Sequence, residues 1–253
     1  MYLLSLPTIV SVLLAIVIAS AVSVALHFVI HPIWAGELSE GTKKTADNVA
    51  VRIGVIYAVV IGMMFANVRI EHVQMVEAIE SEASALVRLY SSLEREAEAE
   101  SEEVRKKLVE YIRFIVEEQW PAIRAARAQP GDRYISGGTK LDPIWDYVLR
   151  VEQKTANKNL CVLLNEVEHD KLMRLFDTKG NVLPLFWYIA LFGYLASLIP
   201  LYVYPPSIRR CGVISLYSSL VSVVLLAIFI LSHPYSAAAG IEPIAFKTLL
   251  DAV

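Results

Sequence analysis

Two residue pairs have the spacing of metal ligands on a helix. Glu166 and His169 stand at i, i+3, as on one helix of a di-iron carboxylate site. Such a site needs a second pair of this kind, and the sequence has none, so a surface pair is the favoured interpretation. His27 and His31 stand at i, i+4, but no carboxylate or thiol lies near them in sequence to complete a ligand set. We therefore expect no metal site.

The sequence also lacks the signatures of catalysis. It has no glycine-rich phosphate loop, nucleophile elbow or zinc motif. The two cysteines, Cys161 and Cys211, lie in different regions, and their spacing favours buried thiols over a disulfide. The net charge of −3 argues against a nucleic-acid partner. We expect neither an enzyme nor a cofactor.

Composition instead indicates a membrane protein. Hydrophobic residues make up 56% of the 253 residues, and they are clustered in blocks of membrane-spanning length. The predicted spans are Leu6–Ile33, Val49–Val68, Leu183–Tyr204 and Val213–Leu231. We predict an all-α membrane protein of four transmembrane helices, with an antiparallel α-helical bundle inserted between the second and the third. The predicted domains are 1–68 (spans one and two), 69–180 (the soluble bundle) and 181–253 (spans three and four with a short tail).

The second span is the element around which the chain is arranged. No helix breaker follows it, and apolar residues continue at steps of three and four from Val73 to Leu93. We therefore predict one unbroken helix that passes from the membrane into the bundle. Within the span, small residues recur every fourth position, a pattern that marks close helix packing in lipid. These predicted packing residues are Gly54, Ala58, Gly62 and Ala66.

The opposite face of the same span has three open interpretations: contact with lipid, contact with a second helix, or the lining of a pore. It carries Ile56, Val60, Met63 and Asn67. If several subunits surround an axis, the apolar members would act as a gate that closes by dewetting. Arg52 and Arg69, near the two ends of the span, are the predicted charges at the pore mouths.

One face of the first span repeats polar and small residues every fourth position. Two interpretations remain open: a packing seam between helices, or a polar pore or proton path. The face is formed by Ser11, Ala15, Ala19, Ser23, His27 and His31.

Three amphipathic segments make up the predicted bundle and tail. One has its apolar side between Val104 and Ile123, with a kink or stop at Pro121, and a single long helix is predicted from Asp142 to Phe176. Gln129–Gly138 is the predicted loop, Thr178–Asn181 the predicted helix end, and a short tail begins at Ile244.

Charges close to the spans give two opposed indications of orientation. Counted over short loops, Lys43, Lys44, Arg209 and Arg210 place the two hairpins in the cytoplasm and the bundle outside. Basic residues on the bundle side, namely Arg69, Lys171, Arg174 and Lys179, favour the reverse. The first indication is weakly preferred, and we expect a multi-pass protein of the inner membrane.

Several short motifs resemble the bacterial bestrophin-like family of membrane proteins. The similarity extends over nearly the whole chain. The motifs are Gly62-Met-Met-Phe65, Glu82-Ala-Ser-Ala85, Leu183-Pro184 with Trp187, His233-Pro-Tyr-Ser236 and Gly240-Ile-Glu-Pro243.

The resemblance implies a homo-oligomeric ion channel. Bestrophins are pentameric anion channels in which the second helix lines the pore and an acidic calcium-binding clasp follows a Pro-Phe-Gly motif. Here Tyr235-Ser236 replace Phe-Gly, and Glu242 alone remains of the acidic run, which argues against calcium gating. The expected partners are the lipid bilayer, further copies of the chain and inorganic ions. The alternative function is a non-conducting membrane scaffold or sensor whose bundle binds another protein.

Overall fold

The computed structural model of the chain consists of helices and their connections throughout the part it describes. That part comprises residues 7–34, 39–96, 99–125, 138–155, 159–176, 182, 184–236 and 238–252. The predicted loop before Gly138 and the predicted helix end at Thr178–Asn181 lie outside it. Contacts between residues divide the chain into two units, Met1–Glu71 with Asn181–Ser232 and His72–Gly180 with His233–Val253.

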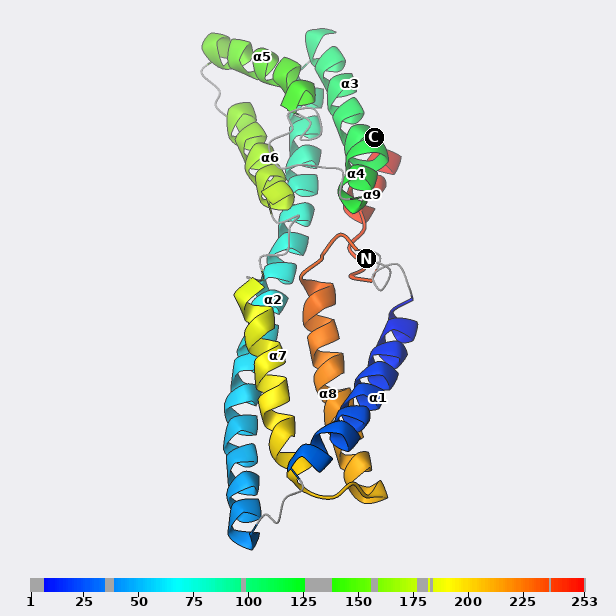
Figure 1. Cartoon of the computed structure of the whole chain (residues 1–253). Coiled ribbons are helices and arrows are strands. Elements are labelled where there is room, and N and C mark those ends of the chain that lie inside the picture. The colour runs from blue at the N-terminus through cyan, green and yellow to red at the C-terminus, as the bar shows by residue number, and fades with distance from the viewer. Residues whose placement is uncertain are drawn as a thin grey trace. The chain divides into compact units, whose positions relative to one another are not determined.

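Among the described residues, the first unit contains four helices long and apolar enough to cross a membrane, in agreement with the predicted number. They are α1 (Thr8–Trp34), the first part of α2 (Glu40–Arg95), α7 (Pro184–Leu198) with the 3₁₀ turn η3 (Ile199–Val203), and α8 (Ile208–Leu231) (Figure 1). The α-helical part of the third span ends at Leu198, where Pro200 cannot donate the next backbone hydrogen bond and a 3₁₀ turn follows. The predicted kink at Pro200 is this turn.

The second helix is unbroken, as predicted, but it begins earlier than its apolar segment. α2 runs from Glu40 to Arg95 without interruption at Arg69. Ser39 precedes it, and its Oγ accepts a hydrogen bond from the Thr42 backbone N–H at 3.3 Å, as an N-cap does. Because this cap lies before the polar residues, the stretch predicted as part of a hairpin up to Asn48 forms the first turns of the helix instead.

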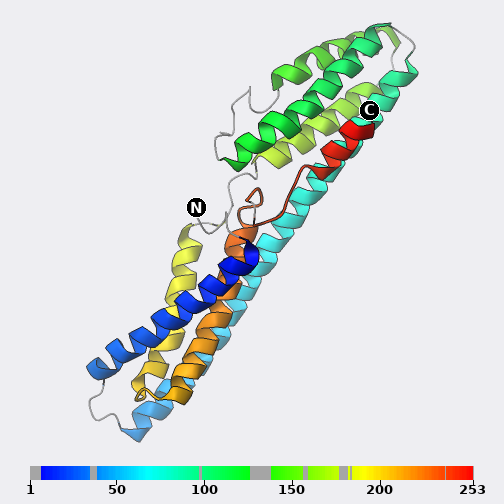
Figure 2. The ribbon, with the colours of Figure 1, turned by 90° about the vertical axis from the view of Figure 1, so that its right-hand side faces the viewer.

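The second unit is built from α3 (Ala99–Phe114), η2 (Ile115–Gln119), α4 (Trp120–Arg124), α5 (Gly138–Thr155), α6 (Asn159–Phe176) and α9 (Ile244–Ala252). They pack with the second part of α2, and α3 and α6 run beside it (Figure 2). Fully buried leucines of three helices, Leu86, Leu108 and Leu164, lie in one hydrophobic core. The predicted apolar seams therefore form the core of this unit.

The single helix predicted from Asp142 to Phe176 is wrong: α5 ends at Thr155 and α6 begins at Asn159. Both halves of its apolar seam are buried, with Val148 on α5 and Leu164 on α6 as examples. A continuous seam cannot distinguish one long helix from two shorter helices that pack in the same core.

A π-helical turn, η2, precedes Pro121. Proline has no backbone N–H, so the i→i−4 ladder cannot continue through it, and the wider turn is one way to accommodate this. The turn leaves Gln119 and Trp120 buried, at 1% and 2% exposure. The kink predicted at this proline is thus a change of helix type that turns two side chains inward.

The C-terminal helix belongs to the second unit. α9 begins at Ile244 as predicted, but it packs against α3 and η2 instead of trailing from the fourth span. Phe246 is fully buried and Leu249 nearly so. The amphipathic pattern of the tail reflects this burial.

Candidate functional site

The predicted pore residues of α2 lie on its open side within the first unit. Ile56 is 65% exposed, Met63 is 70% exposed, and Val60 is half-buried. Arg52 and Arg69 are exposed as well. These side chains are therefore accessible to lipid, to another subunit or to an aqueous pathway.

Asn67 is exposed and has a partner on its own helix. Its Nδ2 donates a hydrogen bond to Glu71 Oε1 at 3.1 Å. The amide that needs a partner at membrane depth thus finds one a turn further along α2. An acidic side chain stands beside Asn67 and close to Arg69 in sequence, so this end of the span carries both signs of charge.

The small residues of α2 do not form its packing face within the chain. Ala58, Gly62 and Ala66 are exposed, and a Cβ added at Gly54 or Gly62 would meet nothing within 4 Å. Packing within the unit uses a different face, formed by Tyr57, Ile61, Met64 and Val68, which shares a buried cluster with α7 and α8. The predicted interface at the small residues stays a prediction for contact with another subunit.

The close approach inside the unit occurs instead at Gly193 of α7. A Cβ built there would lie 2.4 Å from Cδ2 of the buried Tyr57 ring. Such a distance is far below a normal carbon–carbon contact. Gly193 therefore creates the space that the Tyr57 ring fills.

The polar face of α1 is a packing seam. Ser11, Ser23 and His27 are buried, and α1 packs along α8. His27 Nε2 lies 2.9 Å from the Tyr204 carbonyl oxygen, and Ser23 Oγ lies 2.6 Å from Tyr194 Oη. These hydrogen bonds tie α1 to α7 and to the chain after η3, so the packing interpretation is the one the contacts support.

A buried ionic cluster occupies the core of the second unit. Glu82 and Arg174 form a bidentate ion pair, with Nε–Oε2 at 2.7 Å and Nη2–Oε1 at 3.1 Å, and both side chains are 0% exposed. Arg174 Nη1 donates to Gln119 Oε1 at 2.7 Å, and Tyr111 Oη donates to Glu82 Oε1 at 3.1 Å. Four helical segments meet at these polar atoms.

Aromatic residues surround the same guanidinium. Its carbon lies 5.9 Å from the ring of Trp120 and 5.5 Å from the ring of Phe246, within the range of cation–π attraction. Tyr235 Oη donates to the Arg174 carbonyl oxygen at 2.8 Å. Tyr235 and Phe246 thus fix the chain after the fourth span to α6, and the Tyr235 ring also contacts Trp120 of α4. We name the set Glu82, Tyr111, Gln119, Trp120, Arg174, Tyr235 and Phe246 the Arg174 cluster.

The environment perturbs the titration of two members of the cluster. Burial alone would lower the pKa of the Arg174 guanidinium, but the charge and hydrogen bonds of Glu82 outweigh it and raise that pKa. Burial, and then the negative charge of Glu82, raise the pKa of the Tyr111 phenol well above its ordinary value. Arg174 is therefore a permanent cation and Tyr111 a neutral hydrogen-bond donor.

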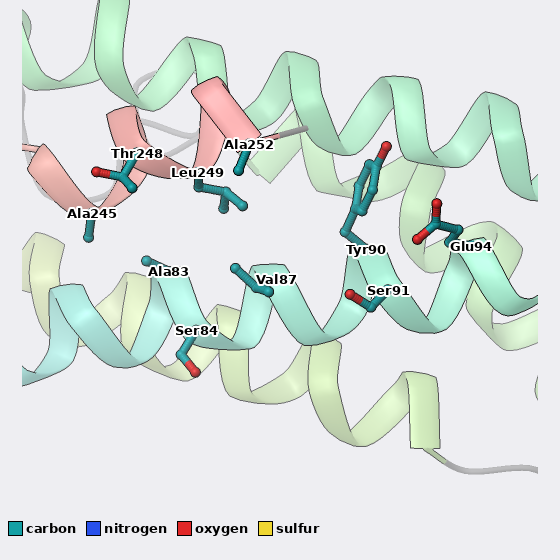
Figure 3. A pocket seen from close by; sticks show the side chains of 10 residues that line it. All are labelled: Ala83, Ser84, Val87, Tyr90, Ser91, Glu94, Ala245, Thr248, Leu249 and Ala252. Atoms are coloured by element: carbon teal, nitrogen blue, oxygen red, sulfur yellow. The ribbon is translucent and has the colours of Figure 1, made fainter.

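A groove lies between α2 and α9, with a volume of about 520 Å³ (Figure 3). Small side chains such as Ala83, Ser84 and Ala245 line much of it, and Glu94 is its charged residue. We name it the α2–α9 groove. It holds no set of catalytic groups.

Most of the chain matches the model of one protein family. The model of the Bestrophin-like domain covers residues 17–246. The chain belongs to the Bestrophin-like family. No curated protein and no solved structure matches it.

Two of the motifs that carry the resemblance meet in the Bestrophin-like structure. Glu82 opens the Glu-Ala-Ser-Ala motif of α2, Tyr235 belongs to the His-Pro-Tyr-Ser motif, and both contact Arg174. These two motifs are recognisable in the sequence, whereas Arg174 is predicted there only as a charge flanking the membrane. Its single signal in the sequence is its position in the apolar seam of α6, two helical turns after Val167.

In the described part of this Bestrophin-like chain, no three His, Cys, Asp or Glu side chains converge. Glu166 accepts a hydrogen bond from Arg88 Nη2 of α2. Glu242, the residue left from the acidic run, lies 3.6 Å from Arg124 Nη2. Its carboxylate takes part in an ion pair on the surface of the second unit.

Proposed function

We propose that the protein is a homo-oligomeric membrane ion channel that conducts anions through a pore lined by α2. The observation that carries the proposal is the open face of α2, where Ile56, Met63 and Asn67 are exposed in a chain of the Bestrophin-like family. A membrane helix with so little of its surface buried in its own chain needs lipid or further subunits around it. Several copies around an axis would satisfy this need.

The small residues of α2 support assembly with neighbouring subunits. Gly54 and Gly62 have open space beyond their Cα atoms, and Ala58 and Ala66 continue the same stripe. In lipid, such stripes allow helices of different subunits to approach closely. The stripe and the proposed pore face are different sides of α2, so one helix can serve both purposes.

Apolar side chains would form the gate of this pore, and charged ones would select the ion. Ile56, Val60 and Met63 would ring the axis and close it by dewetting. Arg52 and Arg69 would attract anions at the mouths. Because Glu71 lies beside Asn67, the attraction is expected to be stronger at the Arg52 end.

The proposed architecture is an antiparallel helical bundle inserted between the second and third spans, on the outer side of the inner membrane. Two of the charges that favour the opposite orientation, Lys171 and Arg174, are buried, and Arg174 is neutralised by Glu82. The positive-inside rule is counted over short loops, and the stretch between the second and third spans is longer than such a loop. The hairpin charges Lys44 and Arg209, which are exposed, then decide the orientation.

Flux measurements on the purified protein in liposomes test the proposal. Chloride should pass, and Met63→Ser should increase the flux, because a polar side chain keeps the constriction wet. Leu216→Ser is the matched control: Leu216 is 73% exposed on α8, similar to Met63, but lies on a helix with no proposed pore role.

If the liposomes pass none of a broad panel of ions, the channel proposal is rejected. That outcome would favour the alternative function, a non-conducting scaffold or sensor, which predicts instead that the second unit retains a partner protein during purification. Equal responses of the two serine variants would reject α2 as the pore lining.

A further inference from the structure

A second groove of the second unit combines positive charge with hydrogen-bond donors. It lies between α2 and α6 and has a volume of about 480 Å³. Arg88, Ser91, Ser92 and Arg95 of α2 form one wall, and Asn159 and Val162 belong to the other. We name it the α2–α6 groove.

The two arginines are placed to act on one ligand. Arg88 and Arg95 are seven residues apart, which is two turns and about 10 Å along one side of a helix. Both are exposed, and Ser92 lies between them in sequence with a hydroxyl that can donate a hydrogen bond. Guanidinium groups bind oxyanions through paired N–H groups, and serine hydroxyls complete such sites.

The charge of the groove is positive along its lining. Its lining residues include two arginines and no carboxylate. Arg88 forms an ion pair with Glu166 of α6, which lies outside the lining, so Arg95 is the arginine that supplies most of the charge available to a ligand. The α2–α9 groove shares Val87 and Ser91 with it but has Glu94 in place of the arginines (Figure 3). Two grooves on either side of the same ridge therefore differ in charge, and the α6 side attracts anions.

A third groove shows that arginine in the lining does not by itself make a groove attract anions. It is lined by Arg105, Lys106 and Arg113, but also by Glu102 and Glu110. Lys106 Nζ lies 3.0 Å from Glu102 Oε1, so cation and carboxylate neutralise each other there. This third groove therefore serves as the control site.

We propose that the α2–α6 groove is a binding site for a phosphate-type oxyanion, held by Arg95 and Arg88 with the hydroxyl of Ser92. The apolar side chains of Val87 and Val162, 44% and 62% exposed, leave room for an organic group attached to the phosphate. The site is independent of the proposed pore, since its residues lie within the second unit and binding does not require conduction.

Titration of the purified full-length protein with inorganic phosphate at constant ionic strength, followed by calorimetry, tests the site. We expect one saturable site per chain, and weaker binding of acetate, which carries a single charge. Arg95→Gln should raise the apparent Kd about fivefold, as expected for an exposed ion pair. The double variant Arg88→Gln/Arg95→Gln should abolish saturable binding.

The matched control is Lys106→Gln/Arg113→Gln in the third groove. This control also removes two positive charges from the second unit, but at another groove, and it should leave phosphate binding unchanged. If phosphate does not saturate the parent protein, or if the control weakens binding as much as the double variant does, the site is rejected. Arg95→Gln alone guards against misfolding, because Arg88→Gln also removes the contact to Glu166.

Discussion

Arg174 and Glu82, which are 92 positions apart in the sequence, form a two-point ion pair at zero exposure in the core of the second unit. Two charges lose more hydration free energy when they are buried than when their ion pair stays exposed. Direct hydrogen bonds with good geometry must offset this loss. Here the carboxylate has an additional donor in Tyr111 and the guanidinium an additional acceptor in Gln119. The pair therefore specifies how these helices meet.

Replacing one partner of this pair is expected to destabilise the second unit strongly. Arg174→Met should lower the free energy of unfolding by about 3–5 kcal/mol, because Glu82 would stay buried without its cation. Chemical denaturation of the detergent-solubilised protein measures the effect. Arg150→Met, which removes an exposed pair with Glu100, should cost about 1 kcal/mol or less. Similar losses in the two variants would contradict the assigned role of the buried pair.

The C-terminal helix is expected to contribute to the stability of the same unit. Phe246→Ala should cost about 3–5 kcal/mol, because it removes a fully buried ring that contacts Arg174 and Trp120. Limited proteolysis should then release residues beyond Ser236 sooner than in the parent protein. The control Ile244→Ala alters a side chain of the same helix that is 63% exposed and should change little.

Overpacking at Gly193 is expected to destabilise the first unit. Gly193→Ala places a methyl group against the Tyr57 ring and should cost about 1–3 kcal/mol. Gly212→Ala is the comparison, since a Cβ there meets nothing within 4 Å and alanine favours a helix. Thermal denaturation in detergent distinguishes them. If Gly193→Ala leaves the denaturation temperature unchanged, the Tyr57 ring moves aside without a loss of stability.

A larger residue at Gly62 should disturb the proposed contact between subunits and not the packing within one chain. Nothing in its own chain lies within 4 Å of an added Cβ, so Gly62→Leu should leave the helical content unchanged while it reduces the oligomer. Light scattering of the purified protein measures the subunit number. Gly212→Leu, equally open and on α8, should leave the oligomer intact. If it dissociates the subunits instead, the subunit interface lies at α8 and not at α2.

Alkaline pH is expected to weaken the second unit through Tyr111. The raised pKa keeps this phenol protonated in the folded state, whereas the unfolded chain loses the proton near pH 10. Its contribution to stability is therefore complete below pH 10 and declines above it. The fall in unfolding free energy between about pH 8 and about pH 10.5 should be smaller for Tyr111→Phe than for the parent protein. An identical fall would show that Tyr111 does not cause it.

The number of spans and the course of α2 could be predicted because they depend on local composition. Blocks of apolar residues and the absence of a breaker at Arg69 are visible in the sequence. The face of α2 that packs within the chain was not predictable in the same way. In a span where almost every residue is apolar, Tyr57 and Ile61 show no contrast with exposed neighbours such as Ile56, and the stripe of small residues indicates another side.

Long-range partners were beyond what the sequence pattern could reveal. Arg174 follows charged residues on an amphipathic helix, where arginine is ordinarily solvated. No residue near Arg174 in the sequence indicates that Glu82 or Gln119 is its partner. The residues nearest in sequence to Pro121 indicate a kink, but not that the resulting π turn would bring an amide to the guanidinium.

The wide turn at Ile115–Gln119 sets the rotational phase of the helix after it. A π turn holds one residue more than the α-helical turn it replaces, so winding the same residues as an ordinary α-helix would rotate Trp120 by roughly 100° away from its present direction. The amide of Gln119 would leave Arg174 by the same rotation. The additional residue of the π turn thus decides that an amide and an indole both face the core.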